Sequence, residues 1–340
     1  MLGTGPAVKL SRRAFLHLAS GAAALPAISR LAGAQAYPVR TVTVIEPFGV
    51  SSVPDITIRI MAPRLSELLG QPVIVENVVG AGGQIAASRV ARGAPDGYHL
   101  LIGTVSSQAF SQTLFKRPLY DAATDFAPII LLAEQPMMLV TSEALPVGNL
   151  QDFIAYARKN QSRMKYGSLA GTGSVNHIIC ALFNQAIGVD VIQVPYRPPS
   201  SIAYQDLISG RIDYVCPVAT GDAKAHIDGG QFRGIAVFSK HRSAILPEVA
   251  TADEQGLTDF QGKQWSAIFA PKGTPAPIIK RLHDAFNDAL ETPEVRARIE
   301  SYGAELVGYD RRSPEYLQEF VETEIRKWAV PIKTSGAGGQ

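Results

Sequence analysis

The chain has 340 residues, of which 46% are hydrophobic and 18% charged, a composition that suits one large or two ordinary globular domains. The formal net charge is +2, but residues 1–36 hold four basic residues and no acidic one, which leaves 28 basic against 30 acidic residues in the remainder. That balance excludes the basic stripe of a nucleic-acid-binding protein, so we expect no nucleic-acid partner. No later apolar run approaches the roughly 18 residues that a membrane span needs.

The N-terminus has the features of an export signal, which we assign to residues 1–36. Arg12 and Arg13 precede an apolar, alanine-rich run, and Ala34-Gln35-Ala36 supplies the small residues typical of a cleavage site. The arginine pair favours the twin-arginine export route over the ordinary secretory route. We therefore expect a soluble periplasmic protein that begins at Tyr37. No cysteine lies near the expected cut, so no lipid anchor is predicted.

The stretch 40–83 predicts a β-loop-α-β unit. Its apolar, β-branched run at 41–46 is typical of a strand, residues 55–69 have apolar side chains at helical spacing, and a second strand is expected at 72–76. Such a unit builds a parallel sheet, in which ligands bind at the carboxyl ends of strands beside helix N-termini. The loop 47–55 is therefore the first candidate ligand site.

Two interpretations of this loop stay open. In the structural one, Ser52 caps the following helix and Asp55 reaches back to complete a capping box. In the functional one, Ser51, Ser52 and nearby backbone N–H groups face a cleft and hold an anion, while Asp55 limits which ligands fit. Phe48 is a further candidate for the cleft, although an aromatic residue beside a strand is usually part of the core. Pro63 predicts a kink or a tolerated distortion in the helix.

The next segments continue the alternation of strands and helices. A helix is expected at 84–92, and the strand at 98–105 ends in small polar residues, so Thr104 and Ser106 join the candidate ligand-binding residues. Further strands are expected at 127–133, 137–141, 191–195, 212–216, 232–238 and 264–270, and further helices at 151–159, 175–187, 201–209, 276–291, 293–302 and 314–328.

A second glycine-rich junction between a strand and a helix occupies residues 165–175. Its glycines allow close approach of the backbone, and its hydroxyl groups can donate to an anion, which gives four candidates: Ser168, Gly171, Thr172 and Ser174. The junction lacks the features of a Walker loop and of a dinucleotide-binding loop, so no cofactor is predicted. A capped structural turn is the alternative. His177 lies one helical turn further on, where a histidine is more often structural than catalytic.

The simplest arrangement of these elements is an α/β fold with two lobes and a ligand cleft between them. The chain is expected to leave the first lobe near Met138 and to return near Trp265, which is also a candidate for the cleft. The predicted lobes are residues 37–140 with 266–340, and residues 141–265.

Motifs of enzymes are absent from the sequence: there is no Gly-x-Ser-x-Gly, no His-Glu-x-x-His and no pair of cysteines at zinc spacing. We therefore predict neither an enzyme nor a metal site. An exported hydrolase that uses Ser168 or Ser174 with His177 is the less favoured alternative. Cys180 and Cys216 have the surroundings of small buried hydrophobic residues, and we expect them to be unpaired, although an exported protein can form a disulfide.

Several sequence blocks occur together in one order. They are Pro47-Phe48 with Asp55, Glu76-Asn77 through Gly80-Ala81-Gly82-Gly83, Pro95-Asp96-Gly97-Tyr98, Asp125-Phe126-Ala127-Pro128, Val194-Pro195-Tyr196 and Ala270-Pro271-Lys272-Gly273-Thr274-Pro275. In these blocks the mature chain resembles the Bug-type periplasmic receptors of tripartite tricarboxylate transporters. The resemblance implies a two-lobe, Venus-flytrap protein that captures a small carboxylate for a membrane permease. It also implies that the first loop and the glycine-rich loop of the second lobe grip the carboxylate, partly through backbone N–H groups and water.

The chain departs from the family pattern at two of these places. The first loop reads Gly49-Val50-Ser51-Ser52 where the family usually has Pro-Gly-Gly, and the turn at Tyr196, a further candidate ligand residue, is one residue longer. Fewer glycines leave fewer freely aimed N–H donors, so the solute can differ from the common dicarboxylates. Asp55 resembles a residue that can meet an amino group of the ligand. We expect a monomer, and a ligand sensor that serves a membrane kinase is the alternative function.

Overall fold

The computed structural model describes residues 3, 37–197 and 200–335, so the predicted export signal, Gly3 apart, lies outside the described residues. Every helix and strand among the described residues belongs to one compact unit, Arg40–Gln340. Among the helices that the structure describes, none combines the length and the apolar character needed to cross a bilayer.

The first sheet has six strands in the order β11-β4-β10-β3-β1-β2. Strands β1 and β2 are parallel, as are β1 and β3, whereas β10 runs antiparallel to both β3 and β4. The strands span Val42–Glu46 (β1), Val73–Asn77 (β2), His99–Thr104 (β3), Phe126–Pro136 (β4), Lys263–Pro271 (β10) and Glu305–Leu306 (β11). The chain therefore completes this sheet with a strand that returns from far along the sequence.

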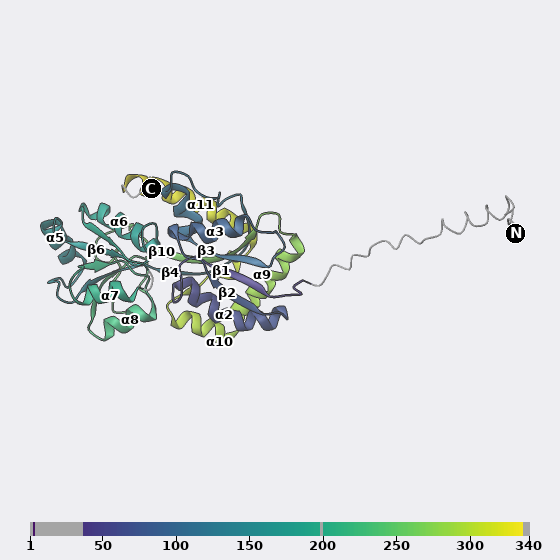
Figure 1. Cartoon of the computed structure of the whole chain (residues 1–340). Helices are drawn as coiled ribbons and strands as arrows, with labels where there is room; N and C mark the ends of the chain where they lie inside the picture. The colour runs from purple at the N-terminus through teal and green to yellow at the C-terminus, as the bar shows by residue number, and fades with distance from the viewer. Residues whose placement is uncertain (1–2, 4–36, 198–199, 336–340) are drawn as a thin grey trace. The chain divides into compact units, whose positions relative to one another are not determined.

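Helices cover both faces of the first sheet. Figure 1 shows α3 and α11 above it and α2 and α10 below it. The helical segments of this part are α2 (Val53–Leu69), η1 (Ala81–Gly83), α3 (Gln84–Ala91), η2 (Ser106–Phe110), α4 (Ser111–Leu114), α9 (Ala276–Glu291), α10 (Pro293–Ser301), η3 (Tyr309–Arg311) and α11 (Pro314–Thr334).

The second sheet has five strands in the order β7-β6-β8-β5-β9. Its strands span Met138–Ser142 (β5), Lys165–Ser168 (β6), Ile192–Pro195 (β7), Tyr214–Val215 (β8) and Phe232–Val237 (β9). Its helices are α5 (Leu150–Asn160), α6 (Val175–Ile187), α7 (Ser201–Ile208) and α8 (Gly221–Asp228). In Figure 1, α5 and α6 lie above this sheet and α7 and α8 below it, so it too is covered on both faces.

Two chain segments connect the sheets. The first runs from the end of β4 through Met137 into β5, and the second contains Gly262 and enters β10. The two segments are hydrogen-bonded, since the N–H of Met137 donates to the carbonyl of Gly262 at 2.8 Å. Phe238, which follows β9, links to both: its N–H donates to Met137 at 2.8 Å, and its carbonyl accepts from Gly262 at 3.0 Å. The lobe boundaries remain a prediction.

Local signals account for the ends of the long helices. Ser52 caps α2 by accepting a hydrogen bond from the N–H of Asp55, as the capping box predicts, and Gly70 ends the helix in the left-handed conformation. Pro63 lies inside α2 without ending it, so the helix tolerates the proline. In the same way, Ser174 caps α6.

The cysteines contradict the sequence expectation. Cys180 and Cys216 form a disulfide, with their Cα atoms 5.5 Å apart. Both residues are fully buried, as expected, but α6 also contacts the segment that leaves β8, since the amide of Asn176 donates to the carbonyl of Cys216 at 2.9 Å. The prediction of unpaired cysteines is therefore wrong.

Candidate functional site

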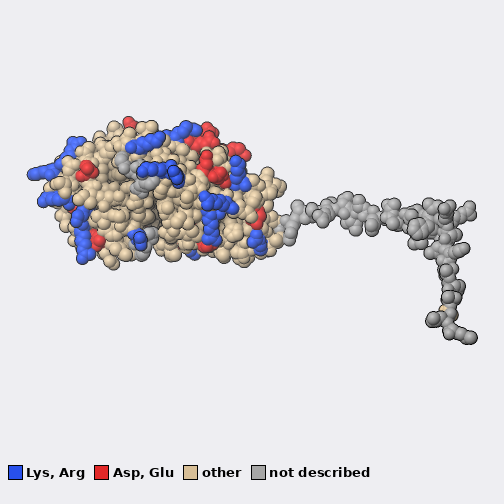
Figure 2. Space-filling model, turned by 45° about the horizontal axis from the view of Figure 1, so that its top comes forward, with Lys and Arg blue, Asp and Glu red and all other residues tan. Residues whose placement is uncertain are grey.

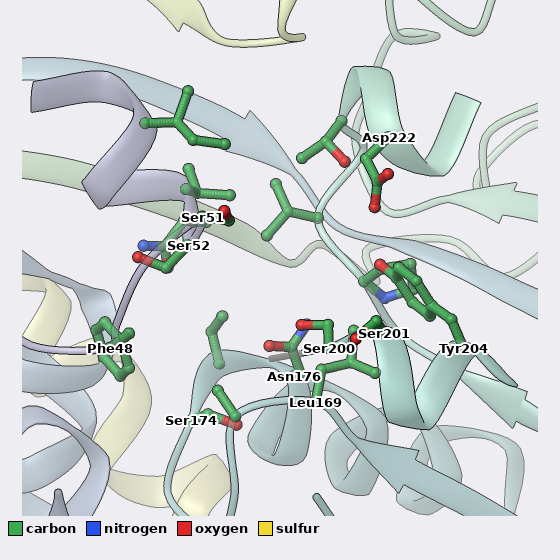
Figure 3. A pocket seen from close by; sticks show the side chains of 18 of the residues that line it. Phe48, Ser51, Ser52, Leu169, Ser174, Asn176, Ser200, Ser201, Tyr204 and Asp222 are labelled. Atoms are coloured by element: carbon green, nitrogen blue, oxygen red, sulfur yellow. The ribbon is translucent and has the colours of Figure 1, made fainter. Parts of the chain in front are cut away.

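A cavity of ≈ 650 Å³ lies between residues that belong to the two sheets and their helices. On the side of the first sheet it is lined by Phe48, Ser51 and Ser52, which lie between β1 and α2. Figure 3 shows these residues on one side of the cavity, with Tyr204 and Asp222 on the other. The cavity therefore lies where strands end and helices begin, as expected for a ligand site in an α/β protein.

Four of the α-helices that the structure describes begin at this cavity. Its lining includes the caps or first residues of α2 (Ser52, Val53), α6 (Ser174, Val175, Asn176), α7 (Ser200, Ser201) and α8 (Thr220, Asp222). The first N–H groups of a helix have no acceptor within the helix, and the helix dipole places about half a positive charge at that end. The site can therefore attract an anion without a basic side chain.

The charged side chains around the cavity are consistent with an anion site formed by backbone N–H groups. Among the described residues that line it, none is Lys or Arg, and Asp222 is the one carboxylate. On the face drawn in Figure 2, basic side chains occur in several separate groups with much neutral surface between them. No group of three or more His, Cys, Asp or Glu residues within the described ranges is arranged to hold a metal ion.

The first loop is built around the buried carboxylate of Glu46. One of its oxygens accepts from the N–H of Phe48 at 2.9 Å and from the hydroxyl of Ser52 at 2.9 Å, and the other accepts from the N–H of Gly49 at 2.7 Å and from the amide of Asn77 at 2.7 Å. Burial raises the pKa of Glu46 above its usual value, although these hydrogen bonds oppose that effect. Several donors of the first loop are thus used inside the protein.

Asp55 also serves the loop. It accepts from the N–H of Ser51 at 3.0 Å, from Arg59 at 2.9 Å and from Asn77 at 2.8 Å, and it is only 1% exposed. Burial alone would raise its pKa, but the hydrogen bonds from Arg59 and Asn77 outweigh burial, so the pKa of Asp55 lies below its usual value. Asp55 is therefore an ionised structural carboxylate that does not line the cavity.

On the opposite wall, the start of α6 is fixed by its own side chains. The hydroxyl of Ser174 donates to the carbonyl of Gly171 at 2.8 Å and accepts from the N–H of His177 at 3.4 Å. The ring nitrogen Nδ1 of His177 accepts from the N–H of Gly173 at 3.2 Å. Burial lowers the pKa of His177 to about 4, so the ring is neutral at pH 7 and holds the loop.

The structure places the thirteen residues of the predicted site in two groups. Five of them line the cavity: Phe48, Ser51, Ser52, Ser106 and Ser174. Eight do not: Asp55, Thr104, Ser168, Gly171, Thr172, His177, Tyr196 and Trp265. Tyr196, for example, donates its hydroxyl to Asp206 at 2.8 Å, and Ser168 accepts from Gln193 at 3.0 Å. Contact of any of these residues with a ligand remains a prediction.

The position of Trp265 follows from the alternation of side chains along β10. Its indole N–H donates to Glu324 of α11 at 3.1 Å, and its ring meets Phe320 edge to face at 5.3 Å. Neighbouring residues on a strand point to opposite faces, so Gln264 points away from α11 and lines the cavity. The sequence analysis selected the aromatic residue and missed its polar neighbour.

Other lining residues also had no place in the predicted site, among them Asn176, Ser200, Ser201, Tyr204 and Asp222. Asn176 follows Ser174 on the first turn of α6, so the predicted helix start could have indicated it. Asp222 could not be found in this way, because the sequence prediction has no counterpart of α8. The helical segment 106–114 has none either.

Comparison with known proteins agrees with the fold and the cavity. The structure is similar to that of the periplasmic binding protein BugD, with a TM-score of 0.82, 32% identity, and 89% of this chain and all of that chain covered. MatC from Rhodopseudomonas palustris, solved with bound malate, gives a TM-score of 0.81 and 35% identity over 87% of this chain and all of its own. Another R. palustris protein, solved with adipate, gives 0.82 and 33% over 89% of this chain and all of its own.

These similarities define the class of the protein: it has the α/β periplasmic binding-protein fold, with two sheets that are covered by helices. The family model described as "Tripartite tricarboxylate transporter family receptor" matches residues 57–337, and the chain belongs to this family. The resemblance to Bug-type receptors is thereby confirmed. The family is one of binding proteins rather than enzymes, and its transporters imply membrane partners.

Proposed function

We propose that the protein is a periplasmic receptor that captures a small carboxylate in the cavity between its two sheets and delivers it to the membrane permease of a tripartite transporter. The observation that carries this proposal is the convergence of four helix N-termini on a cavity whose described lining includes no Lys or Arg. Backbone N–H groups then supply the donors for the carboxylate. The two R. palustris relatives solved with malate and with adipate support this class of ligand.

The start of α6 offers the best donors for binding the carboxylate. Val175 and Asn176 hold the first two N–H groups of that helix, and both residues line the cavity. Asp222 would repel a carboxylate, and Figure 3 shows it away from Ser174 and Phe48. We therefore propose that the anionic end of the ligand lies toward the latter two. About three charge-assisted hydrogen bonds of roughly 1.5–3 kcal/mol each, less the entropy of capture, correspond to micromolar affinity.

The test removes one backbone donor. Proline is tolerated at the first position of a helix, and Ser174 has the extended conformation (φ −70°, ψ 160°) that a following proline requires. Val175→Pro should therefore keep α6 but lose one N–H group. The ligand retained during purification is identified by mass spectrometry and titrated calorimetrically against the wild type, Val175→Pro and Val175→Ala, which keeps the N–H.

We expect Val175→Pro to weaken binding about tenfold and Val175→Ala to weaken it much less. Equal affinities of the wild type and Val175→Pro would show that the start of α6 does not hold the ligand. A retained ligand without a carboxyl group would contradict the carboxylate assignment.

Export is proposed to use the twin-arginine pair Arg12-Arg13, with cleavage after Ala36 and a mature N-terminus at Tyr37. Replacing both arginines by lysine should leave the precursor in the cytoplasm. N-terminal sequencing of the periplasmic product checks the cleavage site. Normal export of the lysine variant would instead assign the ordinary secretory route.

A further inference from the structure

Some apolar side chains line the cavity without being buried. Val50, in the loop between β1 and α2, and Ile208, the last residue of α7, have 66% and 44% of their surface exposed, although both line the cavity. Ile56 of α2 lines it as well and is partly exposed. Removing apolar surface from water is favourable, so a ligand with an apolar body gains affinity by covering these three side chains.

Much of the wall around them is apolar too. Phe48 lies close to Val50 in the first loop, whereas Leu169, Tyr204 and Val218 belong to segments of the second sheet and its helices. All four of these residues line the cavity and are buried. A mainly apolar wall with a few polar groups that fix the orientation of the ligand is typical of small-molecule sites.

The charge on the cavity wall disfavours a second anionic group on the ligand. Asp222, in the first turn of α8, has its side chain 59% exposed, and Figure 3 shows it across the cavity from Phe48. His226 lies one turn further along α8, with Nε2 3.9 Å from the Asp222 carboxylate, so a positive charge on its ring is offset by Asp222. Since the described lining residues include no Lys or Arg, a second carboxylate near Asp222 meets a like charge without a compensating one.

Two of the four helix starts also offer little to a second carboxylate. At α8, Asp222 itself lies at the positive end of the helix dipole. At α2, Pro54 has no N–H group, and the N–H of Asp55 already donates to the hydroxyl of Ser52 at 3.3 Å. The donors for an anion are therefore concentrated at the starts of α6 and α7, which both cover the second sheet.

We propose that the captured solute is a monocarboxylate with an apolar body. Its carboxylate binds at the start of α6 and its body covers Val50, Ile56 and Ile208, while Asp222 excludes a second anionic group. This inference rests on the proposed capture of a carboxylate, and it adds the remainder of the ligand. Specific sites commonly include an element that repels the wrong ligand, and Asp222 is that element here.

The experiment uses matched pairs of acids in which a methyl group takes the place of one carboxylate: hexanoate and adipate, octanoate and suberate, 4-methylbenzoate and terephthalate. Titration calorimetry with the mature protein gives the affinity ratio within each pair. We expect the monocarboxylate to bind about tenfold or more tightly in at least one pair, and the dicarboxylate to be preferred in none.

Asp222→Asn tests the repulsion. It should strengthen the binding of dicarboxylates about fivefold or more and bring the ratio closer to one, a gain that a misfolded variant could not show. Asp228→Asn is the matched control on the same helix, because Asp228 is ion-paired with Lys224 at 2.6 Å and does not line the cavity. The control should keep the ratio of the wild type.

Ile208→Ser tests the apolar contact. It should weaken the binding of monocarboxylates about fivefold. Ile202→Ser is the control, because Ile202 lies on the same helix and is 53% exposed but does not line the cavity. It should change the affinity less than about twofold. Since both side chains are exposed, we expect both variants to fold, which thermal unfolding checks.

The outcomes separate the two levels of inference. Equal or tighter binding of the dicarboxylate in every pair that binds would overturn the apolar monocarboxylate and leave carboxylate capture intact. An unchanged ratio in Asp222→Asn would overturn exclusion by Asp222, and equal affinities of Ile208→Ser and Ile202→Ser would overturn the apolar contact. If no pair binds, the ligand retained on purification decides: an apolar monocarboxylate supports the inference, and any other carboxylate overturns it alone. A retained ligand without a carboxyl group overturns both proposals.

Discussion

Glu46 determines how the first loop is built, although it does not line the cavity. Its two carboxylate oxygens accept four hydrogen bonds, from Phe48, Gly49, Ser52 and Asn77. Each oxygen faces two donors, so the pattern requires an acceptor on both sides of the group. The loop that carries Ser51 and Ser52 to the cavity thus depends on a single buried side chain behind it.

Glu46→Gln tests this dependence. The substitution replaces one oxygen by an NH₂ group that would face two donors, which we expect to lower the free energy of unfolding by about 1–3 kcal/mol and to weaken ligand binding. Glu76→Gln is the control, because Glu76 forms an exposed ion pair with Arg89 and should change stability by less than about 0.5 kcal/mol. Urea denaturation measures both. Equal stability of the two variants would show that the carboxylate is dispensable.

His177 predicts a pH dependence of stability. Its pKa is about 4 in the folded protein against 6.5 ordinarily, because the ring is buried. Between these values the unfolded chain binds a proton that the folded chain does not, so stability is complete above pH 6.5 and falls as the pH drops toward 4, by up to roughly 3 kcal/mol. His177→Asn keeps an acceptor for the N–H of Gly173 and cannot be protonated.

We expect His177→Asn to reduce the slope of stability against pH between 6.5 and 4, as measured by urea denaturation at a series of pH values. Glu134 acts at lower pH. Burial alone would raise its pKa, but the hydrogen bond from Arg311 and the charges of Lys263 and Arg311 outweigh burial and lower it, so its contribution is lost only below about pH 4.5. An unchanged slope in His177→Asn would show that His177 does not cause the loss of stability between pH 6.5 and 4.

Features that depend on residues close together in sequence could be predicted. Features that depend on contacts between distant parts of the chain could not. Ser52 as a helix cap is readable because its partner is three residues away. The role of Glu46 is not, since it needs Asn77 from the neighbouring strand. Gln264 was missed because a polar residue beside a tryptophan gives no signal until the face of β10 is known.

At the scale of elements, the glycine-rich junction 165–175, which suggested an anion-binding loop, packs against a second glycine-rich segment, η1. A Cβ atom added to Gly82 would lie 3.2 Å from the carbonyl oxygen of Gly173. One added to Gly173, whose φ is +87°, would lie 2.8 Å from Leu114. Glycine is needed here for the close approach of the η1 segment and the loop between β6 and α6, and Gly171 does not line the cavity.

Gly173→Ala should therefore disturb the contact between these loops. We expect a loss of about 1–3 kcal/mol in the free energy of unfolding and weaker ligand binding, because the added methyl group overlaps Leu114. Gly188→Ala is the control: φ at Gly188 is +70°, and nothing lies within 4 Å of the added atom, so it carries the backbone strain without the overlap. Similar affinities in the two variants would mean that the loop contact does not shape the cavity.

The order of strands and helices was largely predictable, because apolar periodicity identifies long amphipathic elements. Helix α6 was expected at 175–187 and is observed at Val175–Ile187. The elements without a prediction are short: α8 has eight residues and β11 has two. Elements of this length contain too few turns or alternations to give a pattern, and packing against the rest of the molecule determines them.

At the scale of the whole molecule, the disulfide holds one wall of the cavity. It joins α6 to the segment after β8, and the side-chain amide of Asn176 donates to the carbonyl of Cys216 at 2.9 Å. Asn176 and Pro217, on either side of this connection, both line the cavity. The bond therefore links the stability of the second sheet to the position of the helix N-terminus that faces the ligand.

Replacing both cysteines by alanine should lower the free energy of unfolding by about 3–4 kcal/mol, as expected for a cross-link between residues 36 apart in sequence. The free energy of ligand binding should change by less than this, because the hydrogen bond from Asn176 remains. Urea denaturation and calorimetric titration of the double variant check both effects. A loss of stability below about 1 kcal/mol would show that packing alone holds α6 in place.

Burial of the two sulfur atoms also limits when the bond can be made. Cys180 and Cys216 have no exposed surface in the folded protein, so an oxidising enzyme reaches them only while α6 is detached from the second sheet. A precursor that crosses the membrane after folding would arrive with two buried, reduced thiols. It would have to unfold in part there before the thiols could be oxidised. In a chain that crosses unfolded, the two thiols can be oxidised before folding buries them.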